Sequence, residues 1–252
     1  AHGSPLPLVP ALATSCNSYF CWGLFRMFGD RKYGSPQNAI TVWKDHMVSQ
    51  GFGYKLGVDL PSEGRGLIPN AAFYDKPYTG RWNGLTVISI AIGQGEILAT
   101  PLQIANLSAT IANRGHFITP HIVKEIQDNQ LDSIYRTPRV PTIDRIHYEE
   151  VVKGMRAAVT GGTCRVAGYM FPEGEICGKT GTAQNRGHDH SAFMGFAPMN
   201  NPKIAIAVYV ENGGFGATYG VPIGTLMIEK YLNGTLSMAS EAKAEEFSDR
   251  II

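Results

Sequence analysis

The residue pattern changes near position 176, and this change constrains the fold more than any other feature of the sequence. Three short segments, 176–183, 191–197 and 204–211, are apolar or alternating, and turn residues separate them. Such segments are typical of β-strands. Only residues 198–202 join the second segment to the third, and so short a connection implies an antiparallel pair. The sequence therefore predicts an antiparallel sheet in its C-terminal third.

The segments around these strands carry helix signals instead. Residues 17–28 are apolar around a full turn, which predicts a buried helix, and Ser35-Pro36 supply an N-cap and a first-turn proline for a helix that runs to about residue 51. Three further helices are predicted, at about 100–113, 144–159 and 221–232. Two segments rich in glycine, proline or polar residues are interpreted as loops, 51–84 and 127–142. The fold class is therefore α/β.

Composition excludes several classes of partner and site. With 22 basic and 21 acidic residues the net charge is +1, which gives no electrostatic reason to expect nucleic acid as a partner. No apolar run reaches the roughly 18 residues of a membrane span.

The four cysteines form no CxxC pair and are interpreted as structural thiols. The N-terminal sequence is neither a signal peptide nor a normal start, and we interpret it as a cut inside a longer protein.

Two short motifs carry the residues suited to catalysis. Lys179-Thr180-Gly181, followed by Thr182, lies inside the first predicted strand. Its lysine offers a cation, its threonine hydroxyls can hold a carboxylate, and its glycine lets a substrate backbone approach. Ser15-Cys16-Asn17 lies about 160 residues upstream and fits the S-x-N element that accompanies K-T-G in serine acyl-transfer enzymes. Taken alone, this tripeptide is more often a helix N-cap, since Ser and Asn are preferred capping residues.

Further motifs occur between and after these two. They are Ile92-Gly93-Gln94-Gly95, Ala99-Thr100-Pro101-Leu102-Gln103, His190-Ser191-Ala192-Phe193-Met194-Gly195-Phe196-Ala197-Pro198 and Glu211-Asn212-Gly213-Gly214. In this order the set resembles the class B penicillin-binding proteins, and most of all the elongation-type penicillin-binding protein 2 group. The resemblance covers nearly the whole chain, from His2 to Leu232.

The resemblance implies a fold and a domain organisation. The fold is that of the penicillin-binding-protein and β-lactamase-like transpeptidases, in which helices flank an antiparallel sheet and a helical subdomain is added, here without its N-terminal portion. Residues 1–237 would form a partial transpeptidase domain, and residues 238–252 would form a polar C-terminal tail.

It also implies catalytic roles. In the family, the serine of an S-x-x-K motif attacks the D-Ala-D-Ala end of a stem peptide, D-Ala leaves, and the acyl group passes to an amine of a neighbouring strand. Ser15 would relay protons to the leaving group. Asn17 would orient the first lysine and contact the substrate amide. Lys179 would tune Ser15 electrostatically.

The other residues of the second motif would bind substrate. Thr180 and Thr182 would hold the terminal carboxylate, and Gly181 would let the peptide lie against the strand. The backbone N–H of Thr182 would form half of the oxyanion hole.

The chain departs from the family at the nucleophile. No S-x-x-K motif precedes Ser15, and the one literal match, Ser240-Glu241-Ala242-Lys243, follows K-T-G and is interpreted as chance. The chain alone is therefore expected to be inactive. In the family two upstream strands lie beside the segment 204–211, which would here be an exposed edge.

No cofactor is expected, although a zinc ion is a weaker alternative. The resemblance implies a possible zinc site near S-x-N, held through a histidine and a cysteine, which makes His2 and Cys16 the candidate ligands. The segment His188-Asp189-His190 is interpreted as an exposed hairpin loop. These residues are fewer than the four ligands of a structural zinc site.

The expected partners are peptidoglycan stem peptides, β-lactam antibiotics and membrane-bound proteins of cell-wall elongation. The expected location is the periplasmic face of the bacterial inner membrane, through an anchor outside this chain. Two other functions fit the motifs: a β-lactamase or β-lactam sensor, and a non-catalytic peptide-binding module. The sequence does not specify the organism, the stem-peptide chemistry or the oligomeric state.

Overall fold

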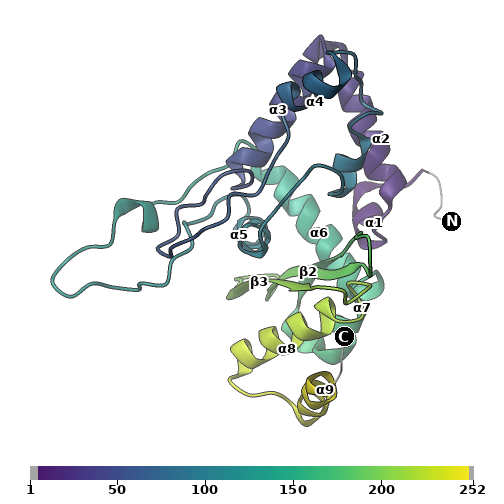
Figure 1. Ribbon diagram of the computed structural model, residues 1–252. Helices are drawn as coiled ribbons and strands as arrows, with labels where there is room; N and C mark the ends of the chain where they lie inside the picture. The colour runs from purple at the N-terminus through teal and green to yellow at the C-terminus, as the bar shows by residue number, and fades with distance from the viewer. Residues whose placement is uncertain (1–4, 250–252) are drawn as a thin grey trace. The chain divides into compact units, whose positions relative to one another are not determined.

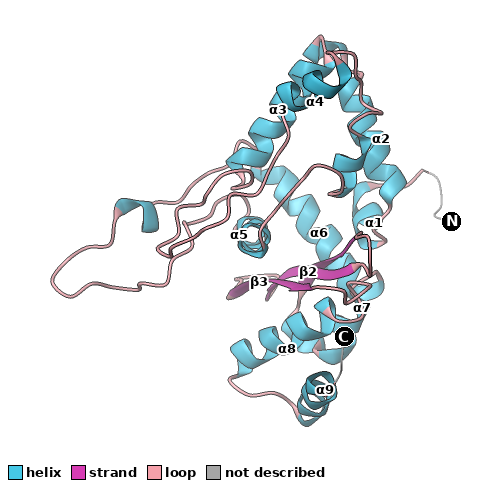
Figure 2. Cartoon of the chain, in the orientation of Figure 1, coloured by secondary structure: helices cyan, strands magenta, loops and turns pink. Residues whose placement is uncertain are grey.

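The computed structural model describes residues 5–249 (Figures 1 and 2). These residues form two compact units. The first unit comprises residues 5–15, 107–115 and 144–249, and the second comprises 16–106 and 116–143. Across 5–249, no helix is both long and apolar enough to cross a bilayer.

One antiparallel sheet lies in the first unit (Figure 2). Its strands are β1 (Cys177–Ala183), β2 (His190–Ala197) and β3 (Ile204–Val210), in the order β1-β2-β3. Thr182 pairs with Ser191 across β1 and β2, and Phe193 pairs with Val208 across β2 and β3. The three predicted strands and their antiparallel pairing are confirmed. K-T-G thus lies on an edge strand.

Helices pack against this sheet and against one another. Those contained in the first unit are α1 (Leu8–Ala13), α6 (Arg145–Gly161), α7 (Arg165–Met170), α8 (Gly220–Asn233) and α9 (Met238–Ser248). α6 packs on α1 and β1, whereas α8 packs on β2 and β3. The predicted helices at 144–159 and 221–232 are confirmed, and α1 and α7 are too short to show a clear period in the sequence.

The segment expected to be a polar tail contains the helix α9. Ser237 caps this helix, because its hydroxyl accepts the N–H of Ser240 at 3.3 Å. The buried carboxylate of Glu229, on α8, accepts the N–H of Ser237 at 2.8 Å and the hydroxyl proton of Ser240. The predicted polar tail therefore contains a polar helix, and one buried carboxylate fastens its start.

The first unit has a continuous apolar core. The aromatic ring of Phe193, on β2, lies in this core and is 1% exposed. Side chains from the helices around the sheet pack in the same core. The other buried members are Ala158, Val159, Cys164, Ala167, Phe171, Ile176, Ala197, Ile206, Val221 and Ile228. Fully burying one such large side chain contributes about 1.5–3 kcal/mol, so the core holds β1 and its motif in place.

In the second unit the described residues form helices and loops. It contains α2 (Asn17–Phe28), α3 (Pro36–Ser49), α4 (Ala71–Tyr78) and the first half of α5 (Pro101–Ala112), which passes to the first unit at Leu107. The short 3₁₀ turns are η1 (Arg31–Tyr33), η2 (Ile88–Ile92) and η3 (Ser133–Tyr135). The predicted helices at 17–28, 36–51 and 100–113 are confirmed, and Ser35 caps α3 by accepting the N–H of Asn38.

The interpretation of residues 51–84 as loop throughout is wrong at α4. Asn70 caps this helix by accepting the N–H of Phe73 at 3.0 Å, and the helix ends at Thr79 in a left-handed conformation. Pro77 lies in its last turn, where its missing N–H removes one helical hydrogen bond, and the helix ends one residue later. The buried ring of Tyr74 anchors the helix in the core of the second unit.

Two loop segments of the second unit, 52–68 and 116–143, form what we call the loop arm (Figure 1). The carboxylate of Glu63 accepts the N–H groups of Leu56, Gly57 and Val58, at 2.6, 3.0 and 3.2 Å. The carboxylate of Asp59 accepts those of Ile122 and Val123. The arm therefore depends on carboxylates that satisfy backbone donors rather than on a strand ladder.

Candidate active site

Ser15 is held in an uncommon backbone conformation directly after α1. Thr14 ends the helix, and Ser15 has φ +53°, in the left-handed region that costs a non-glycine residue roughly 1–2 kcal/mol. Its N–H donates to the carbonyl of Leu12 at 3.2 Å. This turn fixes the direction in which the Ser15 hydroxyl points.

The position of α1 depends on two glycines, one inside α6 and one at the C-cap of α6. At Gly154, a Cβ atom would lie 2.5 Å from the side chain of Leu12. At Gly162, it would lie 2.1 Å from the carbonyl oxygen of Ala13. Both distances are shorter than any real contact, so only glycine allows α1 to lie this close to α6. Ser15 follows two residues after Ala13 and is placed by the same packing.

Lys179 reaches Ser15 from β1. Its Nζ donates to Ser15 Oγ at 2.7 Å and to the carbonyl of Thr180 at 2.8 Å, although 164 positions separate the lysine from the serine. Lys179 forms no ion pair within residues 5–249. Burial lowers the pKa of its ammonium group below the ordinary value of 10.5. The two motifs thus meet through the side chain of one half-buried lysine.

Ser15-Cys16-Asn17 does not act as a side-chain cap. The N-cap residue of α2 is Cys16, and no side chain accepts a hydrogen bond there. The Ser15 hydroxyl is bonded to Lys179 instead. Asn17 is the first residue of α2, is exposed, and belongs to the second unit. The roles assigned to Ser15, Asn17 and Lys179 stay predictions.

The threonines of the K-T-G strand have hydroxyl partners of their own. Thr180 Oγ1 lies 2.9 Å from Thr163 Oγ1, and Thr182 Oγ1 accepts the N–H of Gly216 in a long contact of 3.5 Å. A Cβ at Gly216 would lie 2.5 Å from the carbonyl of Gly181, so the chain after β3 runs directly against β1. Carboxylate binding by Thr180 and Thr182 stays a prediction, as does the oxyanion-hole role of Thr182.

A buried serine holds that chain segment in place. Ser191 pairs with Thr182 in the sheet and is fully buried. Its hydroxyl donates to the carbonyl of Phe215 at 2.9 Å and accepts the N–H of Gly220 at 3.0 Å. One side chain therefore connects the end of the K-T-G strand to the start of α8.

Sequence reasoning missed Thr163 and Cys164, which form the turn between α6 and α7. The only signal for this turn is the pair Gly161-Gly162 before it. Cys164 is fully buried, and this burial raises the pKa of its thiol to about 11. Burial likewise raises the pKa of the Cys177 thiol to about 12. Both thiols stay protonated at neutral pH, as structural cysteines do.

Among residues 5–249 the structure adds no further ligand to the predicted zinc site. His2 lies outside the described residues, and Cys16 is half-buried at the start of α2. Within 5–249 no three or more His, Cys, Asp or Glu side chains gather in a way that could hold a metal ion. His190 has another partner, because its Nδ1 accepts the N–H of Asn212 at 2.9 Å. Zinc binding stays a prediction on His2 and Cys16.

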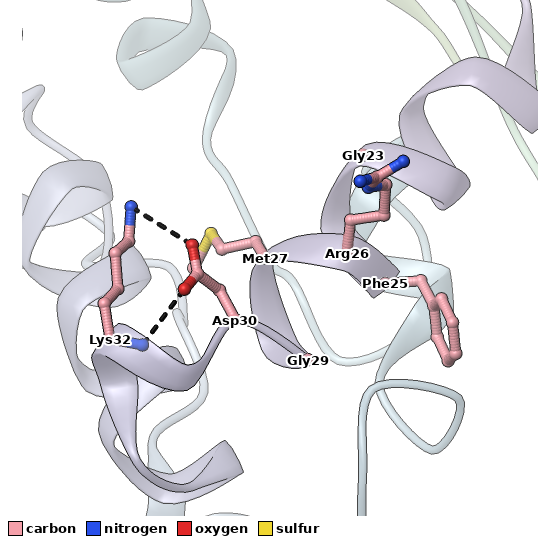
Figure 3. Close-up of a pocket in the computed structure, with 7 residues that line it drawn as sticks. All are labelled: Gly23, Phe25, Arg26, Met27, Gly29, Asp30 and Lys32. Carbon is pink, nitrogen blue, oxygen red and sulfur yellow. Dashed lines mark hydrogen bonds and ion pairs between the residues drawn. The ribbon is translucent and has the colours of Figure 1, made fainter.

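A hollow at the C-terminal end of α2 offers a different kind of site (Figure 3). It is lined by Gly23, Phe25, Arg26, Met27, Gly29, Asp30 and Lys32. Lys32 pairs with Asp30 at 3.6 Å, and both are exposed. This hollow lies in the second unit and no serine or threonine lines it, so it lacks a pair of hydroxyl and lysine like Ser15 and Lys179 in the first unit.

Comparison with known proteins decides the family. The profile of the penicillin binding protein transpeptidase domain matches residues 2–227. The chain belongs to this family. Peptidoglycan D,D-transpeptidase MrdA of Acinetobacter baumannii is 36% identical over 228 residues, which cover 82% of this chain and 32% of that protein. The transpeptidase chain spans about a third of the length of the curated relatives it matches.

Solved structures of the family show the same fold. Pseudomonas aeruginosa PBP2 in complex with WCK 5153 has a TM-score of 0.77 and 32% identity, over 93% of this chain and 50% of that one. PBP2 of Helicobacter pylori, solved in a complex with MreC, has a TM-score of 0.73 and 26% identity, over 91% of this chain and 40% of that one. The predicted penicillin-binding-protein transpeptidase fold and the resemblance to penicillin-binding protein 2 are confirmed.

Proposed function

We propose that this chain is part of a longer peptidoglycan D,D-transpeptidase, which cross-links stem peptides through a serine acyl-enzyme and is acylated by penicillins. The hydrogen bond between Lys179 Nζ and Ser15 Oγ carries the proposal. It joins Ser15 of the S-x-N motif to Lys179 of the K-T-G edge strand inside one compact unit. A catalytic hydroxyl and a cation at this distance are what acyl transfer by a serine requires.

The geometry supports proton relay by Ser15. Its oxygen accepts a hydrogen bond from Lys179, so its own proton is available to another acceptor. As the attacking serine bonds to the carbonyl carbon, its proton passes to the lysine of S-x-x-K. As the C–N bond to D-Ala breaks, the nitrogen takes up the Ser15 proton, and Ser15 regains one from that lysine. The cation of Lys179 stabilises the negative charge that Ser15 carries during this exchange. Asn17 is proposed to orient the first lysine.

The position of β1 supports peptide binding next to these groups. A stem peptide can add to an edge strand through main-chain hydrogen bonds. The hydroxyls of Thr180 and Thr182 would then hold its terminal carboxylate, and Gly181 leaves room for its backbone. At Gly181 a Cβ would meet Ala192 at 3.3 Å, so any larger residue there is tight.

The nucleophile is proposed to lie outside these 252 residues. Ser240 is unsuited to the role, because its side chain is 3% exposed and its hydroxyl is bonded to the Glu229 carboxylate. Lys243, the other end of that chance motif, pairs with Glu246 at 2.7 Å. Neither residue is arranged as a nucleophile with its base.

Covalent labelling of the full-length protein by a fluorescent penicillin tests the proposal. We expect a labelled band that survives denaturation, is lost on competition with unlabelled penicillin, and persists for hours. Rapid loss of the label would favour a β-lactamase, and binding of stem peptide without any label would favour a non-catalytic module. Absence of labelling in a folded full-length protein would overturn the transpeptidase proposal.

Partners and location follow from the same proposal. The Helicobacter pylori relative was solved with MreC, which supports proteins of cell-wall elongation as partners of the full-length protein. β-Lactams and stem peptides would be its ligands. We place it on the periplasmic face of the inner membrane, anchored by a segment outside this chain.

A further inference from the structure

Thr163 connects the two catalytic motifs of the first unit. Its N–H donates to the carbonyl of Ala13 at 3.0 Å, two residues before Ser15. Its hydroxyl accepts that of Thr180 in K-T-G at 2.9 Å. A single residue of the turn after α6 therefore contacts the segment that carries Ser15 and the strand that carries Lys179.

The turn that presents Thr163 is rigid. Before it, Gly162 lies so close to Ala13 that no side chain fits there. After it, Cys164 is fully buried, and its N–H donates to the carbonyl of Ala158 at 2.9 Å. Thr163 itself is half-buried. Its hydroxyl thus has a fixed position from which to orient a partner.

The number of available protons fixes the direction of the hydrogen bond between Thr163 and Thr180 when a carboxylate is bound. Each threonine hydroxyl has one proton to donate and two lone pairs to accept. A carboxylate only accepts, so Thr180 can bind it only by donating its own proton. In that state the hydrogen bond between the two threonines must reverse from its direction in the structure, so that Thr163 donates to Thr180. A donor at Thr163 also polarises the Thr180 hydroxyl and strengthens its bond to the carboxylate.

We propose that Thr163 is a positioning residue for carboxylate recognition: its hydroxyl donates to Thr180 and directs the Thr180 proton toward the terminal carboxylate of the stem peptide or the β-lactam. This inference rests on the transpeptidase function proposed above. Thr163 acts through Thr180 and does not touch the substrate.

The test measures acylation of the full-length protein by a fluorescent penicillin with a free carboxylate. The variants are Thr163→Val, Thr180→Val and the double variant, with Thr163→Ser keeping the hydroxyl. Thr160→Val is the matched control, because Thr160 is exposed on α6 and its hydroxyl bonds only to the carbonyl of Ala157 in its own helix. Circular dichroism checks folding, and Thr163→Ala replaces an unfolded Thr163→Val.

We expect Thr163→Val to lower the second-order acylation constant about 3- to 10-fold, as loss of one hydrogen bond does. Thr163→Ser and Thr160→Val should stay near the wild type. The double variant should be no slower than Thr180→Val, because Thr163 acts only through Thr180.

An unchanged Thr163→Val rate would overturn the inference, and so would effects of the two single variants that multiply in the double variant. In either case the wild type is still labelled, so the transpeptidase proposal stands. A wild type that is folded but not labelled at all overturns that proposal and this inference with it.

Discussion

Lys179 is a half-buried cation that forms no ion pair within the described residues. Its charge is supported by the oxygens of Ser15 and Thr180. Because burial lowers the pKa of its ammonium group below 10.5, it loses its proton at a lower pH than an exposed lysine. If the charged form donates to Ser15 during catalysis, this pKa sets the upper pH limit of the reaction.

The pH profile of penicillin acylation tests this role in the full-length protein. The wild-type rate should fall as pH rises through the lowered pKa of Lys179, with a midpoint below 10.5. Lys179→Ala should lower acylation at neutral pH about 100-fold or more, since general acid–base groups contribute 10²–10⁴, and should remove that alkaline limb. A wild-type rate that rises through the same pH range would show that the neutral amine is the active form.

At the scale of elements, the closeness of α1 to α6 decides where Ser15 lies. This contact is possible because Gly154 and Gly162 have no side chains. It brings the carbonyl of Ala13 within reach of the Thr163 N–H. The site therefore depends on helix packing as much as on the residues that carry the chemistry.

Gly162→Ala tests whether this packing of α1 on α6 controls the position of Ser15. Its Cβ would lie 2.1 Å from the Ala13 oxygen, so the end of α1 must move and take Ser15 with it. We expect a lower melting temperature and an acylation rate at least about 10-fold lower, as small misplacements of catalytic groups give. Gly161→Ala is the matched control, since a Cβ there meets nothing within 4 Å. Equal behaviour of the two variants would contradict the argument.

The loop arm gives a second prediction at this scale. In Glu63→Ala the N–H groups of Leu56, Gly57 and Val58 lose their shared carboxylate. Hydrogen bonds to a charged group contribute about 1.5–3 kcal/mol, so these amides should exchange with solvent about 10-fold faster or more. Hydrogen exchange followed by mass spectrometry measures this. Glu125→Ala, in the same arm, should leave the three amides protected.

At the scale of the whole molecule, the chain holds the S-x-N and K-T-G motifs, and its one S-x-x-K match lies in α9. There Ser240 helps to fix α9 to α8 through Glu229. This structural role accounts for the burial of Ser240 without any catalytic function.

Ser240→Ala should therefore leave penicillin labelling of the full-length protein unchanged within about twofold, while lowering its unfolding free energy by about 1–3 kcal/mol, because the buried Glu229 carboxylate loses one of its two hydrogen bonds. Labelling and thermal unfolding measure the two effects. The isolated 252-residue chain should not be labelled. Labelling of the isolated chain would place the nucleophile within these 252 residues. Loss of labelling in full-length Ser240→Ala would place the nucleophile in α9.

The sequence predicted the elements whose signals are local. Apolar and alternating residues predicted the three strands, and Ser35-Pro36 marked the start of α3, which the structure shows. It failed at α4, where glycines and prolines on both sides hid an eight-residue helix. It failed again at α9, whose polar residues show no apolar period because one buried carboxylate, not an apolar face, fastens its start.

By itself the sequence determined the fold class, the family and the two motifs, because strand alternation, caps and short motifs are properties of neighbouring residues. Only the tertiary structure decided that Lys179 contacts Ser15 across 164 positions, that Thr163 contacts Thr180, and that Ser240 is buried. The physical reason is that these contacts depend on how closely α1, α6 and β1 pack. That closeness is set by glycines and buried side chains whose effect appears only once the chain has folded.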